Sequence, residues 1–141
     1  MEEEVFYSRV KGGSCTVHLG GHCRIQTVHP ADFYYIPNRR AVIIGQYEEE
    51  REWGLMDLEE IPKDAVRISV DKEKLDKVMS AHEEFLKVYE KEGKRIWDYE
   101  KRHGKFPNGS FLTKLASEIK PEEFKNRFHR ACEETFVPPK G

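Results

Sequence analysis

The sequence predicts an α+β protein, in which an N-terminal small antiparallel β-barrel or bent sheet is followed by a C-terminal three-helix segment. Two observations support this prediction. Six or seven short β-prone runs, separated by turn residues, fill residues 1–71, and apolar residues recur at helical spacing in residues 72–141. A length of 141 residues is common for a single domain. We therefore expect the β-rich half and the helical half to pack together as one compact domain.

The first half contains the strand signals. A Gly20-Gly21 pair lies between two β-prone runs and predicts a tight hairpin, because glycine enters positive φ without a steric penalty. In a two-residue turn, His18 would face Cys23 across the strands. Residues 41–44 (AVII) form a continuous apolar run ended by Gly45, which is typical of a central strand covered on both faces. The strands are expected at residues 5–10, 15–19, 22–28, 33–36, 41–44, 52–58 and 65–70.

The second half contains the helix signals. We expect a first helix that is capped by Asp71, is weakened in its middle by Gly93 and ends at His103. Ser110 is expected to cap a short second helix, and Pro121 to begin a third. Proline suits that position because its fixed φ is already helical and its missing N–H has no partner there.

Two further expectations concern the helical half. The apolar stripe of the first helix passes through Ile96 and Tyr99, and we expect Trp97 to pack in the core beside them. The final Val137-Pro138-Pro139 predicts an exposed tail. Such a tail could dock a partner protein.

Composition and charge narrow the class of protein. Three cysteines without framework spacing argue against a disulfide scaffold, and no run of residues has the length and apolar character of a membrane span. The acidic start Met1-Glu2-Glu3-Glu4 is unlike a signal peptide, so we expect a cytoplasmic protein. The net charge of −2 conceals an asymmetry, because residues 1–71 carry −5 and residues 72–141 carry +3.

A cluster of cysteine and histidine around the predicted hairpin raises the question of a zinc site. The predicted register divides these side chains between the two faces of the hairpin, and no second ligand pair follows later in the chain. We therefore predict no metal and no cofactor. The residues concerned are Cys15, His18, His22, Cys23 and His29.

The same histidines support one enzymatic hypothesis. A metal-free ribonuclease or hydrolase could use His18, His22 or His29 with Arg39 and Arg40, since histidine transfers protons near neutral pH and arginine stabilises a phosphorane. No spacing in the sequence forces these groups to converge. The chain also lacks a P-loop, a glycine-rich dinucleotide motif and a nucleophile elbow. We therefore keep this hypothesis as a second alternative.

The most basic stretch is residues 91–105 (KEGKRIWDYEKRHGK), where cations alternate with aromatic residues. Cationic side chains bind phosphates and aromatic rings stack on bases, so the pattern favours DNA or RNA as a ligand. Two short helices then follow, and the second is basic, which is typical of a helix-turn-helix or of a plain helical hairpin. The candidate nucleic-acid-binding residues are Lys94, Arg95, Lys101, Arg102, Lys105, Arg127 and Arg130.

These observations together favour a non-enzymatic binding protein with nucleic acid as its ligand and no membrane partner. The alternative is a regulatory role through protein–protein interaction, as an adaptor or inhibitor subunit of a larger complex. A long charged helix beside a small β-unit suits such a role.

Overall fold

The computed structural model describes residues 1–11, 15–20, 23–27 and 29–139, and for residues 15–20 and 23–27 it describes the backbone alone. The chain divides into two compact units. The β-sheet unit comprises Met1–Leu75 together with Cys132–Gly141, and the helical unit comprises Asp76–Ala131. The C-terminal residues therefore belong with the β-sheet, and the expectation that the two halves pack as one domain stays a prediction.

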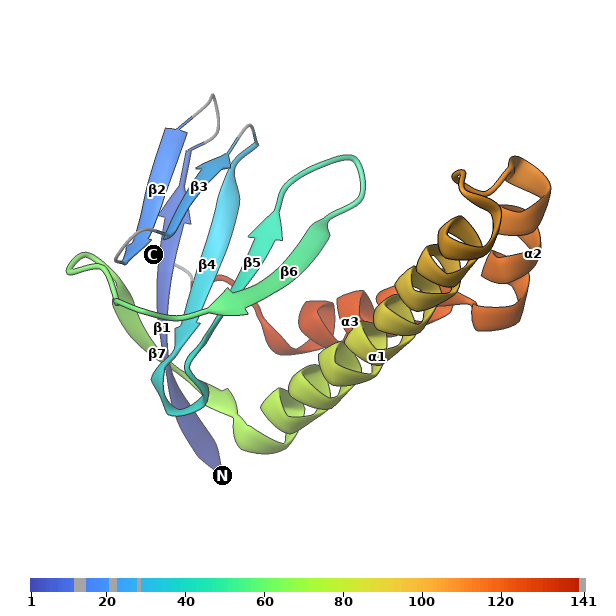
Figure 1. Cartoon of the computed structure of the whole chain (residues 1–141). Helices are drawn as coiled ribbons and strands as arrows, with labels where there is room; N and C mark the ends of the chain where they lie inside the picture. The colour runs from blue at the N-terminus through green and yellow to red at the C-terminus, as the bar shows by residue number, and fades with distance from the viewer. Residues whose placement is uncertain (12–14, 21–22, 28, 140–141) are drawn as a thin grey trace. The chain divides into compact units, whose positions relative to one another are not determined.

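The β-sheet unit is built on a five-stranded antiparallel sheet with the strand order β6-β5-β4-β1-β7 (Figure 1). The sheet is open, with β6 and β7 as its two edges, so the bent-sheet form of the prediction is confirmed and the closed barrel is not. The N-terminal strand β1 lies in the interior of the sheet between β4 and β7. The strands are β1 (Glu2–Val10), β4 (Ala31–Ile36), β5 (Ala41–Gln46), β6 (Glu52–Asp57) and β7 (Val66–Asp71).

A separate hairpin of β2 (Cys15–Gly20) and β3 (Cys23–Thr27) follows β1. The predicted hairpin is confirmed, but its predicted register is wrong. His18 pairs with Arg24 instead of Cys23, and Cys23 pairs with Gly20 after an irregularity between His18 and Gly20. Gly20 belongs to β2 and pairs with Cys23, so the strand ends one residue later than predicted, and the irregularity then places His18 opposite Arg24. Gly21 and His22 lie outside the described residues.

Strand β4 is buried along its whole length because both faces of the sheet are covered there. One face carries an apolar cluster of Ala31, Phe33, Tyr35, Val42 and Ile44. On the other face, Tyr34 lies against Phe136, with ring centroids 4.7 Å apart. The alternation of β4 side chains between the two faces follows from the two-residue period of a strand. The predicted double coverage of residues 41–44 is confirmed, since all four are buried.

Gly45 is an internal residue of β5 and not the end of the strand that the sequence predicts. It pairs with Trp53 of β6, and a Cβ atom at Gly45 would lie 2.8 Å from Cζ3 of the Trp53 ring. Glycine is required here because the indole ring occupies the space of a side chain. Trp53 is only 6% exposed, and its indole N–H donates a hydrogen bond of 2.9 Å to Glu133.

Three helices complete the chain: α1 (Lys72–His103), α2 (Gly109–Ile119) and α3 (Pro121–Thr135). The first and third helices lie close to the predicted ranges, and α1 passes through Gly93 without interruption. The predicted cap of α2 is wrong, because Asn108 and not Ser110 accepts the hydrogen bond from the Phe111 amide, at 3.0 Å. Asparagine and serine cap helices about equally well, so composition alone does not decide between them.

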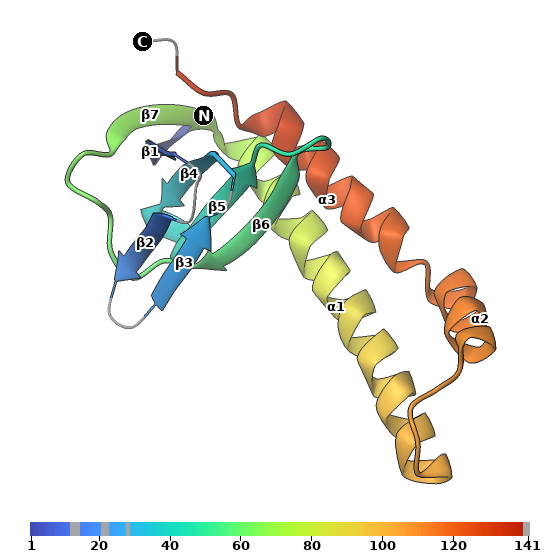
Figure 2. The ribbon, with the colours of Figure 1, turned by 90° about the horizontal axis from the view of Figure 1, so that it is seen from above.

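Within the helical unit, α3 runs beside α1, and α2 lies against the C-terminal end of α1 (Figure 2). We call this end of α1, together with α2, the far end of the helical unit. The His82 and Phe128 rings contact each other between α1 and α3, with centroids 5.0 Å apart. The prediction that Trp97 packs in the core is wrong, because its side chain is 58% exposed. In the described part of the chain, no helix has both the length and the apolar character needed to span a membrane.

The Gly45–Trp53 contact yields a test of the sheet. We expect Gly45→Ala to lower the free energy of unfolding by about 1–3 kcal/mol, because the new methyl group overpacks against the indole ring. Gly54→Ala is the matched control in the neighbouring strand, since a Cβ atom there meets nothing within 4 Å. Urea unfolding of both variants measures the difference. Equal losses of stability at the two positions would contradict this packing.

Candidate functional site

The positive charge of the helical unit is concentrated at the far end of α1. The unit, Asp76–Ala131, contains 13 Lys and Arg and 10 Asp and Glu. Residues 91–105 alone contain six Lys and Arg and three Asp and Glu. The remainder of the unit is therefore neutral, and its whole surplus of three positive charges lies in this stretch. A local surplus of this kind attracts anions more strongly than the same charge spread over the unit.

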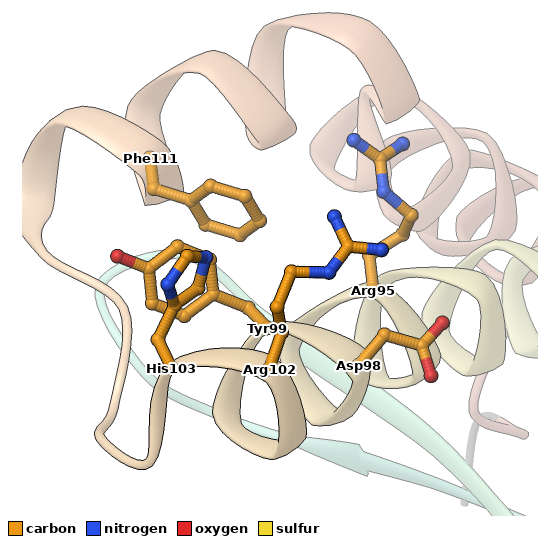
Figure 3. A pocket seen from close by; sticks show the side chains of 6 residues that line it. All are labelled: Arg95, Asp98, Tyr99, Arg102, His103 and Phe111. Atoms are coloured by element: carbon orange, nitrogen blue, oxygen red, sulfur yellow. The ribbon is translucent and has the colours of Figure 1, made fainter.

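A pocket of about 210 Å³ lies at this end, between α1 and the beginning of α2 (Figure 3). The Tyr99 ring stands at its centre, 4.5 Å from the Phe111 ring and 4.3 Å from the His103 ring between centroids. Arg102 extends beside these rings on the side facing Arg95, and the Asp98 carboxylate points away from them (Figure 3). The lining residues are Arg95, Asp98, Tyr99, Arg102, His103 and Phe111.

Helical periodicity explains why these α1 residues share one face. Positions that are three, four or seven residues apart lie above one another on a helix. Arg95, Tyr99 and Arg102 satisfy this spacing, and so does His103, four residues after Tyr99. Phe111 comes from α2, whose first turn is fixed by the Asn108 cap. The pocket therefore depends on one helix face and on one residue supplied by the next helix.

The structure brings together two of the seven predicted site residues. Arg95 and Arg102 line the pocket, and Arg95 also forms an exposed ion pair of 3.5 Å with Glu118 of α2. The other five do not line it. Lys94, Lys105 and Arg130 are exposed, Lys101 lies 5.9 Å above the Trp97 ring, and Arg127 forms a 2.9 Å ion pair with Glu123.

Four residues that line the pocket were not among the predicted site residues, namely Asp98, Tyr99, His103 and Phe111. Tyr99 was expected to continue the apolar stripe of the first helix, and both Tyr99 and Phe111 are partly exposed. The spacing of residues 95, 99 and 102 is a signal that could have found the α1 part of the pocket. Nothing in the sequence indicates that Phe111 packs on Tyr99 across a turn.

A second polar cluster lies in the β-sheet unit, around Asp32 of β4. The Asp32 side chain is fully buried, and its Oδ1 atom accepts hydrogen bonds from the Tyr7 hydroxyl at 2.5 Å and from Nε of Arg9 at 2.9 Å. Its Oδ2 atom accepts hydrogen bonds from the Tyr47 hydroxyl and from Arg51. We call these five residues the Asp32 cluster.

Aromatic rings enclose the two guanidinium groups of this cluster. The Arg51 guanidinium carbon lies 4.3 Å from the ring centroid of Tyr47 and 4.3 Å from that of Trp53. Arg9 lies 5.1 Å from the Tyr47 centroid on a more exposed side. Cation–π contacts of this kind are worth more when the cation is withdrawn from water, as Arg51 is. The cluster thus stabilises the loop between β5 and β6, where Tyr47 and Arg51 lie.

Asp32 is held in its charged form. Burial alone would raise the pKa of Asp32, but the hydrogen bonds from Arg9, Tyr47 and Tyr7 outweigh burial and keep the pKa below its usual value. Burial and the hydrogen bond to Asp32 raise the pKa of Tyr7 to about 12. Both carboxylate oxygens are occupied by donors, so Asp32 is poorly placed to accept a proton from a substrate. The arrangement is that of a structural ion pair.

The predicted hairpin cluster of Cys15, His18, His22 and Cys23 cannot be placed, because these side chains lie outside the described residues. His29, the fifth member, is exposed and lies 3.6 Å from the Glu48 carboxylate. Elsewhere in the described part of the chain, no group of three or more His, Cys, Asp and Glu side chains is arranged to hold a metal ion.

Comparison with known proteins adds no functional information. The chain matches no family model, no curated protein and no solved structure.

The Asp32 cluster predicts a large effect of a nearly isosteric substitution. We expect Asp32→Asn to lower the free energy of unfolding by about 3–5 kcal/mol, because it leaves the mostly buried Arg51 cation without its anion. Glu4→Gln is the matched control, since Glu4 forms a 2.7 Å ion pair with Arg67 on the surface. Such exposed pairs contribute about 0–1 kcal/mol. Chemical denaturation of both variants measures the difference, and similar losses would show that burial of the pair is irrelevant.

The pKa of Asp32 also predicts how stability depends on pH. A carboxyl group with a lowered pKa in the folded state stabilises the fold above its unfolded pKa of about 4, and this contribution disappears as the pH falls through the folded pKa. The raised pKa of Tyr7 contributes below about pH 10, and this contribution disappears as the pH rises toward 12. The urea midpoints of the wild type and of Asp32→Asn should therefore converge as the pH falls from ~4 through the folded pKa of Asp32. A constant difference across that range would contradict a charged Asp32.

Proposed function

We propose that this chain is a non-enzymatic nucleic-acid-binding protein that contacts its ligand through the far end of the helical unit. The observation that carries the proposal is the pocket in which Arg95 and Arg102 stand beside three aromatic rings. Guanidinium groups bind phosphates, and aromatic faces stack on bases. A nucleic acid offers both groups at a regular spacing, which makes it the ligand best suited to this surface.

Exposed lysines extend the positive surface from the pocket round α1 toward Trp97, because Lys101 lies 5.9 Å above the Trp97 ring and Lys94 is one helical turn before it. Lys94, Lys101 and Lys105 are all exposed, and they lie in the stretch 91–105 that carries the surplus charge. Lysine binds phosphates as a point charge without demanding one geometry. These residues support binding along a phosphate backbone, whereas the arginines support a contact with defined orientation.

Arg127 and Arg130 of α3 are the weaker part of the proposal. Arg127 forms an ion pair with Glu123 and lies 4.9 Å above the Phe124 ring. Both members of the Arg127–Glu123 pair are about half exposed, so the pair is weak and phosphate could displace it at little cost. We retain both residues as a peripheral contact on the same unit.

A protein partner is the second candidate, and a specific observation favours it. The helical unit exposes four large apolar side chains, namely Leu86, Tyr89, Trp97 and Phe106, at 46–63% of their surface. Leu86, Tyr89 and Trp97 lie on one side of α1, because they are three and eleven residues apart, and an exposed apolar helix face often marks a protein interaction site. An adaptor or inhibitor subunit would use these side chains, and the basic stretch would then serve as a solvated rim.

The ribonuclease alternative is less well supported. Arg39 donates two hydrogen bonds of 3.0 and 2.9 Å to the nearly buried Glu3 carboxylate, so its guanidinium already serves a structural ion pair. Arg40 adopts positive φ as the C-cap of a short 3-10 helix (Pro37–Arg39). Of the two arginines that this mechanism could use to stabilise a phosphorane, Arg39 is thus occupied in a structural role, and the Arg40 side chain is exposed.

The salt dependence of binding tests the proposal. Affinity for a short single-stranded oligonucleotide should fall steeply with salt, by roughly 300-fold between about 50 and 200 mM for six phosphate contacts. Replacing Lys94 and Lys101 with Ala should weaken binding and reduce the slope of log affinity against log salt by about 1.4, or about 0.7 per lost contact. Fluorescence anisotropy at several salt concentrations measures both quantities.

The matched control replaces Lys77 and Lys87 with Ala, because these residues are also exposed on α1 and removing them changes the net charge equally. We expect this control to bind almost as the wild type does. Equal losses in the two variants would show that the far end of α1 is not the contact region. An absence of binding at low salt would leave the protein-partner candidate.

A further inference from the structure

We infer that the pocket at the far end of the helical unit is a subsite for one unpaired base of a single-stranded nucleic acid, with the adjoining phosphates held by Arg95 and Arg102. This inference rests on the proposed function and specifies the ligand that the site would select. It is carried by the shape of the pocket, by its aromatic lining and by the position of its cations.

The size of the pocket limits which part of a ligand can enter it. Its volume of about 210 Å³ lies below the range of roughly 300–1,000 Å³ that is usual for pockets holding whole small molecules. A single planar ring fits this space better than an intact nucleotide with its sugar and phosphates. The rest of a bound nucleotide would therefore lie outside the pocket, over the surrounding surface.

The aromatic lining limits the shape of the group that can bind in the pocket. Tyr99 and Phe111 lie at an interplanar angle of 47°, and Tyr99 and His103 at 43°. The three rings form a concave and partly exposed wall instead of a closed stack, since Tyr99 and Phe111 are partly exposed and His103 is exposed. A flat base can lie against such a wall, and stacking of this kind tolerates any base because every base has a π-face.

Arg95 and Arg102 fix the position of the sugar–phosphate backbone of the bound strand. Arg95 and Arg102 are seven residues apart on the same face of α1, and both border the ring wall (Figure 3). Arg95 and Glu118 are each 46% exposed, and a pair with this exposure is displaced by a phosphate at little cost. Within the described residues, Arg102 has no ion-pair partner, so its guanidinium is available to a ligand.

A base in a duplex cannot use this pocket, because its faces are covered by the neighbouring bases in the stack. A duplex would contact only the cations and would bind through its phosphates. The pocket therefore predicts a preference for single strands, in addition to the phosphate affinity that both forms share. A protein partner has no equivalent requirement for an unpaired planar ring beside two anions.

The experiment compares an intact single-stranded oligonucleotide with one of the same length whose residues are abasic, at low salt. Wild type should bind the intact strand on the order of tenfold more tightly, which is the usual contribution of one stacked base. Phe111→Leu should weaken this preference severalfold, because leucine keeps an apolar contact with Tyr99 but removes one of the three flat rings. Phe111→Tyr should restore the preference, and melting temperatures of both variants verify that they are folded.

Trp97→Leu is the matched control, because Trp97 is an exposed aromatic residue of the same helix. It lies two residues from both Arg95 and Tyr99, so it projects from the opposite side of α1. The preference for the intact strand should survive this substitution. Loss of the preference in Trp97→Leu, with Phe111→Leu behaving as wild type, would place the stacked base on the other face and overturn the inference.

Photo-crosslinking of the wild-type protein with an iodouracil-substituted strand gives an independent result that does not depend on a folded variant. Crosslinks should appear at Tyr99, His103 or Phe111, and crosslinks confined to other residues would overturn the inference. Equal binding of intact and abasic strands with a steep salt dependence would also overturn it, while leaving the proposed function in place. An absence of binding by either strand would overturn both.

Discussion

A carboxylate removed entirely from water imposes a constraint on the β-sheet unit, because an isolated buried charge would cost several kcal/mol. Asp32 meets this constraint with donors from two other parts of the chain. Tyr7 and Arg9 come from β1, and Tyr47 and Arg51 come from the loop between β5 and β6. The strand β1 in turn pairs with β7. One side chain on the central strand β4 thus connects segments that are 15 to 25 residues distant in the sequence.

The packing of Trp53 and of the C-terminal segment depends on the same interaction. The Arg51 guanidinium that binds Asp32 lies against both the Tyr47 and Trp53 rings, and the Trp53 ring occupies the space above Gly45. The indole N–H of Trp53 bonds to Glu133, and the Trp53 and Phe136 rings lie 6.0 Å apart between centroids. The C-terminal segment is therefore packed against the sheet through residues that the Asp32 cluster positions. In this unit the two arginines of the cluster, Arg9 and Arg51, serve the structure, whereas Arg95 and Arg102 of the helical unit are exposed.

Much of this fold follows from local patterns in the sequence. The five main strands and three helices lie close to their predicted positions, because two-residue and 3.6-residue periodicities and the glycine and proline boundaries are strong signals. The prediction began β4 at residue 33 and so excluded Asp32, since aspartate is depleted in strands. The reason for its presence is a set of partners distant in the sequence, which periodicity does not reveal. The hairpin register failed for a local reason, because Gly20 pairs as part of β2 and an irregularity between His18 and Gly20 then shifts the pairing.

The candidate site was predictable in part. Charge and composition identified the stretch 91–105, and helical spacing places Arg95 and Arg102 on one face. The position of Phe111 depends on the turn between α1 and α2 and on the Asn108 cap, so its contact with Tyr99 was not predictable. Trp97 illustrates the opposite error, because an aromatic residue beside an apolar stripe was expected to be buried and is exposed.

The central claim is that the β-sheet unit is a scaffold held by the Asp32 cluster and that the far end of the helical unit binds the ligand. The most direct measurement is an NMR titration of isotope-labelled protein with a single-stranded oligonucleotide. We expect the largest amide shifts in residues 91–112, with the amides of β1, β4 and β5 almost unchanged. Large shifts around Asp32, with none at the far end of α1, would contradict this account.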